Sequence, residues 1–433
     1  MLLVNNPGSW SHIYWPLEHA AWNGWTFTDL VFPFFLFMVG VSMMFSFPRR
    51  LARGDSKRTL FTHVVRRSVA LMLLGWWGSV WWRMFWTGGG LNDVAAIVLR
   101  VGFTGLILGA VVLLAGTERT RIWKWICIGG ASLFAVGSVL LGFEDTLWSG
   151  ITHIRIPGVL VRIAWCYLLA SSIYFLTPDR NALIKWTVGL LGGYALWMMF
   201  VPIPGFGMPD LSRGFPTGDT PVGELFSNWA FFLDYHILGS HTWSVRQLQD
   251  ASGQLIWSFD PEGIISTISA TCSVLLGMVT GQWLTREDRS PSEKLNGLFV
   301  AAGWLMILGL LFSIWMPINK RIWTSSYTIF TAGMALATLG VLYHAIDMRG
   351  WKKWAYPLLA YGRNAIFSFV ASGMMATAMI RIRMADGTTL KGMIYEAIPG
   401  TPEMASFIFG ISFVTLWATI AWLLDTKKIY FKI

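Results

Sequence analysis

Long apolar runs recur from one end of this 433-residue chain to the other, and they restrict its fold more than any other feature. Runs of 18 or more apolar residues are long enough to cross a bilayer as helices. Charged residues make up only 13% of the chain, against about 25% in a typical soluble domain. Inside a bilayer every backbone N–H has to be satisfied within its own segment, which favours helices. The sequence therefore predicts an all-α polytopic membrane protein.

The apolar runs give eleven predicted transmembrane helices, at residues 28–47, 68–86, 94–116, 122–142, 158–177, 183–203, 262–284, 296–316, 326–346, 355–380 and 404–424. We treat 1–433 as a single transmembrane domain, within which residues 204–261 form one long polar loop. The opening residues MLLV look like the last turn of a helix and are followed at once by the polar NNPGSW. We therefore expect a truncated additional helix at the N-terminus.

The basic residues give this predicted bundle an orientation. Of the 33 Lys and Arg residues, 21 lie in loops on the side of loop 48–67 and 8 lie in loops on the other side. Cytoplasmic loops carry the excess of Lys and Arg, so the C-terminus is predicted to be cytoplasmic. The loop around His19 and the loop 204–261 are then extracytoplasmic. A net charge of +10 would also suit a nucleic-acid partner, but these charges sit in short loops between apolar helices, which excludes that class.

Metal and soluble-enzyme signatures are missing from the sequence. Its three cysteines, Cys127, Cys166 and Cys272, all lie inside apolar runs. An odd number of cysteines without close spacing is neither a disulfide framework nor a zinc site, so we interpret them as small core residues and expect no metal. The nucleophile-elbow, zinc-protease, P-loop and dinucleotide-binding motifs do not occur in a suitable context.

The stretch HAAWNGWTFTDL places a histidine just before an apolar run. His19 can accept a proton near neutral pH or be acylated as a nucleophile, although alone it would be an ordinary interfacial histidine. Asp29 follows at the start of the run, where a carboxylate either marks function or caps a helix, and the two roles can coexist. Trp22 and Asn23 lie at the turn between them and are candidates for binding a sugar.

Two arginines follow in the stretch HIRIPGVLVR. Arg155 precedes a predicted helix, and Arg162 lies about one turn inside it. An arginine within a membrane helix needs a partner. A phosphate would serve, because the guanidinium donates bidentate hydrogen bonds, and so would a buried Asp or Glu.

Three further polar stretches lie at the predicted ends of helices. In FDPEG, Asp260 and Glu262 are either ordinary helix starters or ligands for an amino group or sugar hydroxyls. In PINKRIW, Asn319 and Lys320 stand beside an indole, which suits a phosphate, a carboxylate or an interfacial anchor. In YGRNAIFSF, Arg363 enters a helix from the cytoplasmic side and could meet a charged cofactor there.

Five stretches, in this order along the chain, resemble the transmembrane heparan-α-glucosaminide N-acetyltransferases and their bacterial homologues: HAAWNGWTFTDLVFPFFLFMVG, HIRIPGVLVRI, FLDYHILGSHTW, FDPEGIISTI and PINKRIWTSSY. The resemblance covers residues 4 to about 370. It implies a membrane enzyme that moves acetyl from cytosolic acetyl-CoA to the amino group of a glucosamine-type sugar across the membrane. For a bacterial chain this implies the inner (plasma) membrane. The active-site histidine of the family matches His19, and an upstream asparagine matches Asn5 better than Asn6.

The resemblance and the residue chemistry together suggest roles. His19 either takes the proton of the amine directly or becomes acetyl-histidine first, with Asn5 holding the carbonyl oxygen. The candidates for binding the donor are Arg155, Arg162, Lys320, Asn319 and Arg363. The candidates for orienting the histidine or the acceptor are Asp29, Asp260, Glu262, Trp22 and Asn23. A sugar transporter and a polysaccharide O-acyltransferase are the alternative functions. The partners are the amino-sugar acceptor and the lipid bilayer, with a homodimer left open.

Overall fold

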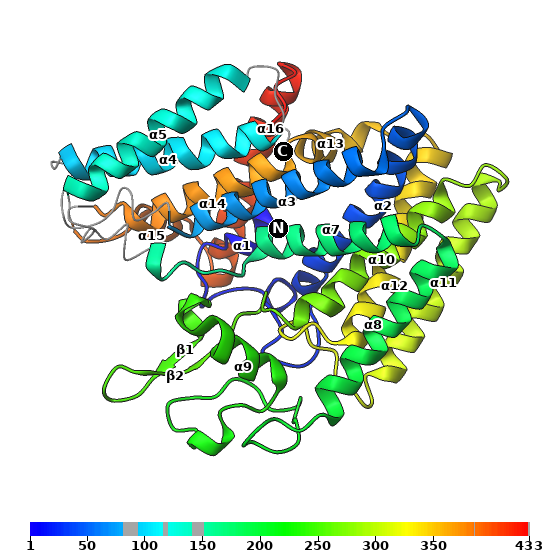
Figure 1. Cartoon of the computed structure of the whole chain (residues 1–433), viewed down its shortest axis with the longest axis horizontal. Helices are drawn as coiled ribbons and strands as arrows, with labels where there is room; N and C mark the ends of the chain where they lie inside the picture. The colour runs from blue at the N-terminus through cyan, green and yellow to red at the C-terminus, as the bar shows by residue number, and fades with distance from the viewer. Residues whose placement is uncertain (81–93, 116–119, 141–150, 385, 432–433) are drawn as a thin grey trace.

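The computed structural model describes residues 1–80, 94–115, 120–140, 151–384 and 386–431. The predicted spans reach residues 81–86, 116 and 141–142, which lie outside the described residues. The helices are α1 (Leu2–Asn5), α2 (Val31–Ala52), α3 (Lys57–Val80), α4 (Val94–Ala115), α5 (Thr120–Leu140), α7 (Val159–Leu176), α8 (Arg180–Phe200), α9 (Trp229–Leu233), α10 (Ser266–Leu284), α11 (Pro291–Phe312), α12 (Ser325–Leu342), α13 (Tyr356–Arg363), α14 (Ala365–Arg381), α15 (Leu390–Glu396) and α16 (Pro402–Thr426). Two short strands, β1 (Gln247–Gln249) and β2 (Leu255–Ser258), pair antiparallel (Figure 1).

The all-α polytopic architecture is confirmed. In the part of the chain that the structure describes, nine helices are long and apolar enough to cross a membrane. Of the eleven predicted spans, 68–86 is not among the nine. Its described part, residues 68–80, is the second half of α3, and residues 81–86 lie outside the described residues. The residues MLLV, predicted to be the last turn of a helix, overlap the single turn α1.

The predicted span 355–380 is wrong as one continuous helix. It is divided at Asn364, where α13 ends and α14 begins. The Asn364 side chain donates to the Ile429 carbonyl at 3.0 Å and accepts from the Phe431 N–H at 2.9 Å. An asparagine that bonds to backbone groups in this way competes with helix continuation. The resulting α14 has 17 residues and is shorter than the nine spans.

Helix α2 packs against α10 through glycines that let the two backbones touch. A Cβ on Gly277 would lie 1.9 Å from the Phe37 carbonyl oxygen, and one on Gly40 would lie 2.0 Å from the Val274 carbonyl oxygen. Gly281, four residues after Gly277, meets Met44 and Val41 in the same groove. Small residues spaced by four allow close helix packing in membranes, where apolar burial between helices gives little driving force.

The predicted polar loop 204–261 is instead a folded layer with an apolar core, here called the loop layer. Its buried side chains form one cluster with Trp22 and with the ends of the helices, and include Leu225, Phe226, Trp229, Phe231, Trp257 and Phe259. Figure 1 shows this layer below the bundle, with β1, β2 and α9 in it. The loop layer therefore covers the helix ends that lead to His19.

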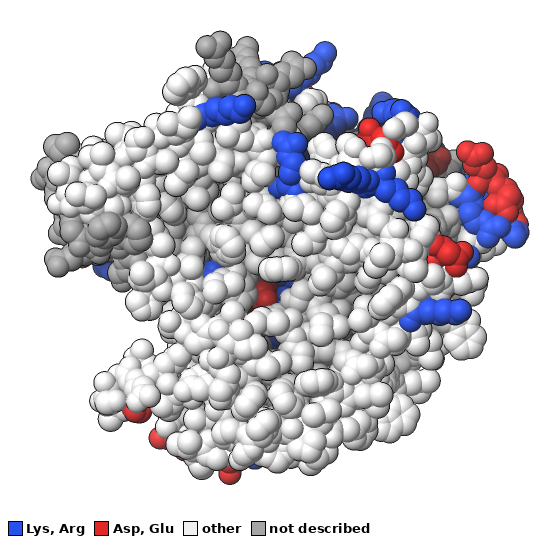
Figure 2. Space-filling view, viewed as in Figure 1, with Lys and Arg blue, Asp and Glu red and all other residues white. Residues whose placement is uncertain are grey.

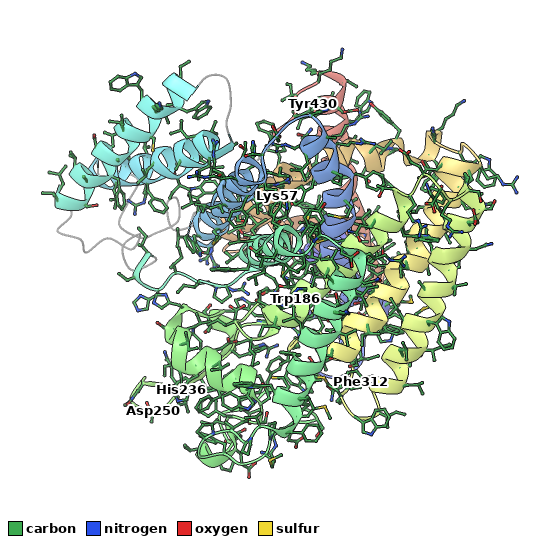
Figure 3. All side chains as sticks on the ribbon, turned by 45° about the vertical axis from the view of Figure 1, so that its right-hand side comes forward. Lys57, Trp186, His236, Asp250, Phe312 and Tyr430 are labelled. Atoms are coloured by element: carbon green, nitrogen blue, oxygen red, sulfur yellow. The ribbon has the colours of Figure 1, made fainter. Side chains whose placement is uncertain are left out.

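The loop layer and the basic loops lie at different ends of the molecule. Figure 3 places His236 and Asp250 in the loop layer and Lys57 and Tyr430 at the far end. In Figure 2, most of the visible Lys and Arg side chains gather at that far end, and few charges lie over the loop layer. By the positive-inside rule, the end of the molecule that carries the excess of Lys and Arg is the cytoplasmic end. The orientation itself stays a prediction.

Changing Gly277 to Ala tests the contact between α2 and α10. The added methyl group meets backbone rather than a flexible side chain, so we expect unfolding to become easier by about 1–3 kcal/mol. The matched control is Gly303→Ala in α11, where a Cβ meets nothing within 4 Å. The measurement is the thermal midpoint of both variants in detergent. A Gly277→Ala midpoint no lower than that of Gly303→Ala would contradict the packing.

Candidate active site

His19 lies in a triangle with one carboxylate and one ammonium group. Its Nδ1 is 2.6 Å from Oδ1 of Asp29 and 3.0 Å from Nζ of Lys320. The third side of the triangle joins Lys320 Nζ to Asp29 Oδ1 at 3.2 Å. The Asp29 side chain is 1% exposed, whereas that of His19 is 29% exposed. The triangle is thus anchored on a buried carboxylate and is open to ligands at the histidine.

The local sequence explains why Asp29 is held so firmly. Thr26 begins the 3₁₀ turn Phe27–Leu30, and Asp29 closes a capping box with it. The second carboxylate oxygen of Asp29 accepts the N–H groups of Ala20 at 3.0 Å and of Thr26 at 3.1 Å. The Tyr327 hydroxyl donates to the Asp29 carbonyl at 2.6 Å. The sequence predicted Thr28 or Asp29 as the N-cap, whereas the N-cap is Thr26 and Asp29 is the third residue of the turn. The capping box and the contact with His19 use the same carboxylate.

The triangle selects one tautomer of His19. Nδ1 cannot donate to Asp29 and accept from Lys320 at the same time. The carboxylate contact is the shorter of the two and Asp29 is acceptor-only when ionised, so Nδ1 carries the proton and Lys320 donates to Asp29. The lone pair is then on Nε2, for which the described residues provide no hydrogen-bond partner. A carboxylate that fixes the tautomer of a histidine in this way prepares the other nitrogen for proton or acyl transfer.

Electrostatics keep this imidazole neutral. Burial lowers the pKa of His19, the hydrogen bond to Asp29 raises it, and the positive charge of Lys320 lowers it again, with a net decrease. Burial also lowers the pKa of Lys320, against the attraction of Asp29. A histidine whose pKa lies below its usual range is unprotonated at neutral pH, as a base or nucleophile requires.

Two cavities meet beside the triangle. The first, of about 660 Å³, is lined by His19 and Lys320 together with Asn5, Glu262 and other side chains. The second, of about 430 Å³, lies among α3, α7, α14 and α16 and is lined mostly by apolar residues. Both are lined by Asn5, Trp10, Arg155 and Val159, so they adjoin. Figure 2 shows a hollow between the helices and the loop layer, with charged side chains at its inner end.

Of the two candidate asparagines, Asn5 lines both cavities. Asn6 is buried, and its side chain donates to the Leu2 carbonyl at 2.8 Å. The structure therefore places Asn5, the preferred match, where a ligand could reach it, while its catalytic role stays a prediction.

Arg155 is paired with both acidic residues of the FDPEG stretch. Its guanidinium donates twice to Asp260, at 2.7 Å each, and once to Glu262 at 2.5 Å. Burial opposes the charge on Arg155, but the two carboxylates outweigh it and raise its pKa above the usual value. Three residues predicted as separate ligands are thus bonded to one another, which argues for a structural role. Their binding of donor or acceptor stays a prediction.

Arg162 is buried inside α7 and is only partly satisfied. It donates to the Gly263 carbonyl at 3.1 Å and to the Ser266 hydroxyl, and its guanidinium lies 5.2 Å from the Trp323 ring centre. Among the described residues, its Nε and Nη1 have no hydrogen-bond partner. Trp323 itself has a φ of 49°, a left-handed conformation that is strained for a bulky side chain. Strain of this kind is common at functional sites.

Four predicted ligands are engaged elsewhere. Asn319 donates to Asn23 at 3.0 Å and accepts the Ile322 N–H at 3.1 Å. The Trp22 ring is buried in the loop-layer cluster and donates to the Leu211 carbonyl at 2.9 Å, so neither of its faces is available for stacking on a sugar. Arg363 pairs with Asp425 at 2.7 Å and lines neither cavity. The structure does not bring Arg363 to the His19 triangle.

The five family-like stretches converge on this site. Every one of the five stretches makes a hydrogen bond or an ion pair with another of them. The bonded pairs are His241 and Ile154, Arg155 and Asp260, Asp234 and Asp260, Lys320 and Asp29, and Asn319 and Asn23. Their spacing along the chain gives no hint of these pairs. Their shared polarity at helix ends was the only signal that they belong together.

Asp234 is a central residue that sequence reasoning missed. It lies in FLDYHILGSHTW and is fully buried. Its carboxylate accepts the N–H groups of Asp260 at 3.0 Å and Ile264 at 3.3 Å, and burial raises its pKa to about 8. Asp234 therefore fixes the loop that carries Asp260 and Glu262. Arg246, Arg321 and Trp243 were also missed, although each lines the first cavity.

Comparison with known proteins finds two distant relatives. The heparan-alpha-glucosaminide N-acetyltransferase of Mus musculus is 25% identical over 471 aligned residues, which cover all of this chain and 58% of that protein. The protein of the same name from Homo sapiens is 25% identical over 468 residues, with the same coverage. The chain is a distant relative of these N-acetyltransferases. It thus spans 58% of the length of the curated relatives it matches. No family model matches it.

The relatives confirm the family-level resemblance that the sequence predicted. The names of those two proteins describe an N-acetyltransferase that acts on a glucosaminide. Their names say nothing of individual residues, so the roles of His19, Asp29 and Lys320 rest on the geometry described above. Within the described residues, no three His, Cys, Asp or Glu side chains come together as a metal ion would need.

Gly263→Ala tests the role of Asp234 in the site. The added methyl group would lie 2.3 Å and 2.4 Å from the two carboxylate oxygens of Asp234, so we expect a loss of about 1–3 kcal/mol in stability. Gly223→Ala is the matched control in the loop layer, because its Cβ meets nothing within 4 Å. Thermal midpoints of the two variants provide the comparison. Equal midpoints would mean that Asp234 does not clamp this loop.

Proposed function

We propose that this protein is a membrane acetyltransferase that moves acetyl from cytosolic acetyl-CoA to the amino group of a glucosamine-type sugar on the extracytoplasmic side. The observation that carries the proposal is the His19–Asp29 pair, which leaves Nε2 unprotonated beside a cavity of about 660 Å³. The distant relationship to N-acetyltransferases supports the same reaction class.

The geometry favours a route through acetyl-histidine. Nε2 of His19 attacks the thioester carbonyl, a bond from nitrogen to carbon forms, and the carbon–sulfur bond breaks to release the CoA thiolate. The uncharged amine of the sugar then attacks the acetyl carbon, and the bond to Nε2 breaks. The freed Nε2 accepts the proton that the amine loses and passes it to solvent or to the CoA thiolate. Two adjoining cavities let the donor and the acceptor reach His19 from different sides and one after the other, which favours this route over direct proton abstraction.

The surrounding residues have roles that follow from their positions. Asp29 stabilises the positive charge that develops on the ring after attack, through its bond to Nδ1. Asn5 lines both cavities and supplies an amide donor for the carbonyl oxygen. The second, mostly apolar cavity among the helices suits the arm of the donor, and the first suits the acceptor. Lys320 is then a partner of Asp29 and a neighbouring positive charge for His19 rather than a phosphate ligand.

The test of this function is acetyl transfer from labelled acetyl-CoA to glucosamine by the purified chain. We expect His19→Ala to lower the rate by at least about 1000-fold, because both the nucleophile and the group held by Asp29 are lost. His236→Ala is the matched control, since His236 is an exposed histidine in the loop layer (Figure 3). Label retained on wild-type protein without acceptor supports acetyl-histidine.

A His19→Ala variant as active as His236→Ala would refute the site. Acetyl recovered on hydroxyl groups rather than on the amine would favour a polysaccharide O-acyltransferase. Uptake of labelled glucosamine into proteoliposomes without any CoA ester would favour a transporter.

Lys320→Gln tests the electrostatic control of His19. The positive charge of Lys320 disfavours the imidazolium, so removing it raises the pKa of His19. The reactive form is neutral, and we therefore expect the acidic limb of the rate–pH profile to move to higher pH. Lys320→Arg keeps the charge and should leave the limb close to its wild-type position. A limb that stays in place in Lys320→Gln would show that Lys320 does not tune the histidine.

A further inference from the structure

Two arginines in the first cavity have no acidic partner. Arg246 and Arg321 both line the cavity that contains His19. Among the described residues, neither guanidinium makes a hydrogen bond or lies within 4 Å of a carboxylate. The Nε of Arg246 is buried and unpartnered. Arg155 in the same cavity differs, because two carboxylates neutralise it.

Both guanidinium groups lie near the same aromatic ring, that of Phe215. The Cζ atom of Arg246 lies 3.9 Å from the ring centre of Phe215, and that of Arg321 lies 5.8 Å from the same centre. Phe215 is itself fixed by contacts with Phe231 and Phe259 in the loop-layer cluster. Cation–π stacking uses the flat face of a guanidinium and leaves the N–H groups at its edge free to donate.

The electrostatic environment of Arg246 and Arg321 is unfavourable for two positive charges when no anion is bound. Burial lowers the pKa of Arg246, and the charge of Arg321 lowers it further. Burial also lowers the pKa of Arg321, although Asp29 and Glu262 act against this from a distance. Two like charges that are partly removed from water and left unpaired are what a bound anion would compensate.

We propose that Arg246 and Arg321 form a subsite for an anionic group, a carboxylate, phosphate or sulfate, on the acceptor that enters the first cavity. The assignment to an acceptor with an amino sugar rests on the proposed function. Neither arginine lines the second cavity among the helices, which suits the donor. Arg321 follows Lys320 directly and is close enough to His19 for its charge to lower the pKa of the imidazole. An anion held there lies next to the reacting amine.

Equilibrium binding to the detergent-solubilised full chain, without acetyl-CoA, tests the proposal. The probes are glucosamine, glucosamine 6-phosphate and a disaccharide of glucosamine linked to glucuronic acid. We expect at least one anionic probe to bind wild type about 10-fold more tightly than glucosamine. Arg246→Gln and Arg321→Gln should each remove most of this advantage and leave glucosamine binding unchanged. Arg246→Lys, which keeps the charge without the bidentate fork, should retain part of it.

Arg213→Gln is the matched control. Arg213 lies in the loop layer, pairs with Glu224 at 2.8 Å and does not line the first cavity, so the variant should bind all probes as wild type does. Thermal midpoints show whether each variant is folded. The two Gln variants should show the same loss of anion-dependent binding, which misfolding of one variant would not explain.

The proposal is overturned if no anionic probe binds more tightly than glucosamine, or if the advantage survives in both Gln variants. It is also overturned if the variants weaken binding of CoA alone and leave the sugars unaffected, because the anion would then be a donor phosphate. Charge-dependent sugar binding without acetyl transfer would refute the proposed function and leave the subsite standing.

Discussion

The buried carboxylate of Asp29 is the group on which the rest of the site depends. An ionised carboxylate that is 1% exposed at the start of a membrane helix has to be fully bonded, and Asp29 obtains partners from two segments. It accepts from the backbone of its own loop, from the His19 ring and from Lys320. Satisfying one charge thus fixes the start of α2, the orientation of the histidine and the turn before α12.

A second buried group of charges holds the opposite wall. Asp234 binds the backbone of the FDPEG loop, and Asp260 and Glu262 of that loop bind Arg155. Leaving one member of such a network unpaired costs far more than an exposed ion pair contributes. The glycine contacts of α2 and α10 supply the rigid frame beneath both groups. The cavity is therefore bounded by polar networks whose partners come from helix ends and from the loop layer.

Much of the fold could be predicted from the sequence, because apolar length and charge asymmetry are local properties. Within the described residues, each of the eleven predicted spans corresponds to a helix or to a divided helix. The division at Asn364 could not be predicted, since its cause is a bond to residues 429 and 431, more than 60 positions away. The folded loop layer was missed for a related reason. Its aromatic residues are scattered among polar ones and form a core only when β1, β2 and α9 are brought together.

The residues of the site could be predicted from the sequence, but the pairs that these residues form could not. His19, Asp29 and Lys320 were all selected from their positions at helix ends, yet nothing in the sequence joins residue 320 to residue 19. Arg155 was predicted to bind the donor and Asp260 the acceptor, whereas the structure pairs the two side chains with each other. Asp234 escaped notice because a fully buried acid in a loop carries no local signature. Long-range pairing is the information that a single sequence lacks.

The most direct test of this account is the tautomer of His19. Nitrogen NMR of protein labelled with ¹⁵N-histidine separates the ring nitrogens, and a spectrum of His19→Gln assigns the signals among the seven histidines. The account predicts, near neutral pH, a protonated Nδ1 bonded to Asp29 and an unprotonated Nε2. A protonated Nε2, or an imidazolium at that pH, would contradict it, because the nitrogen that faces the chemistry would then hold no lone pair.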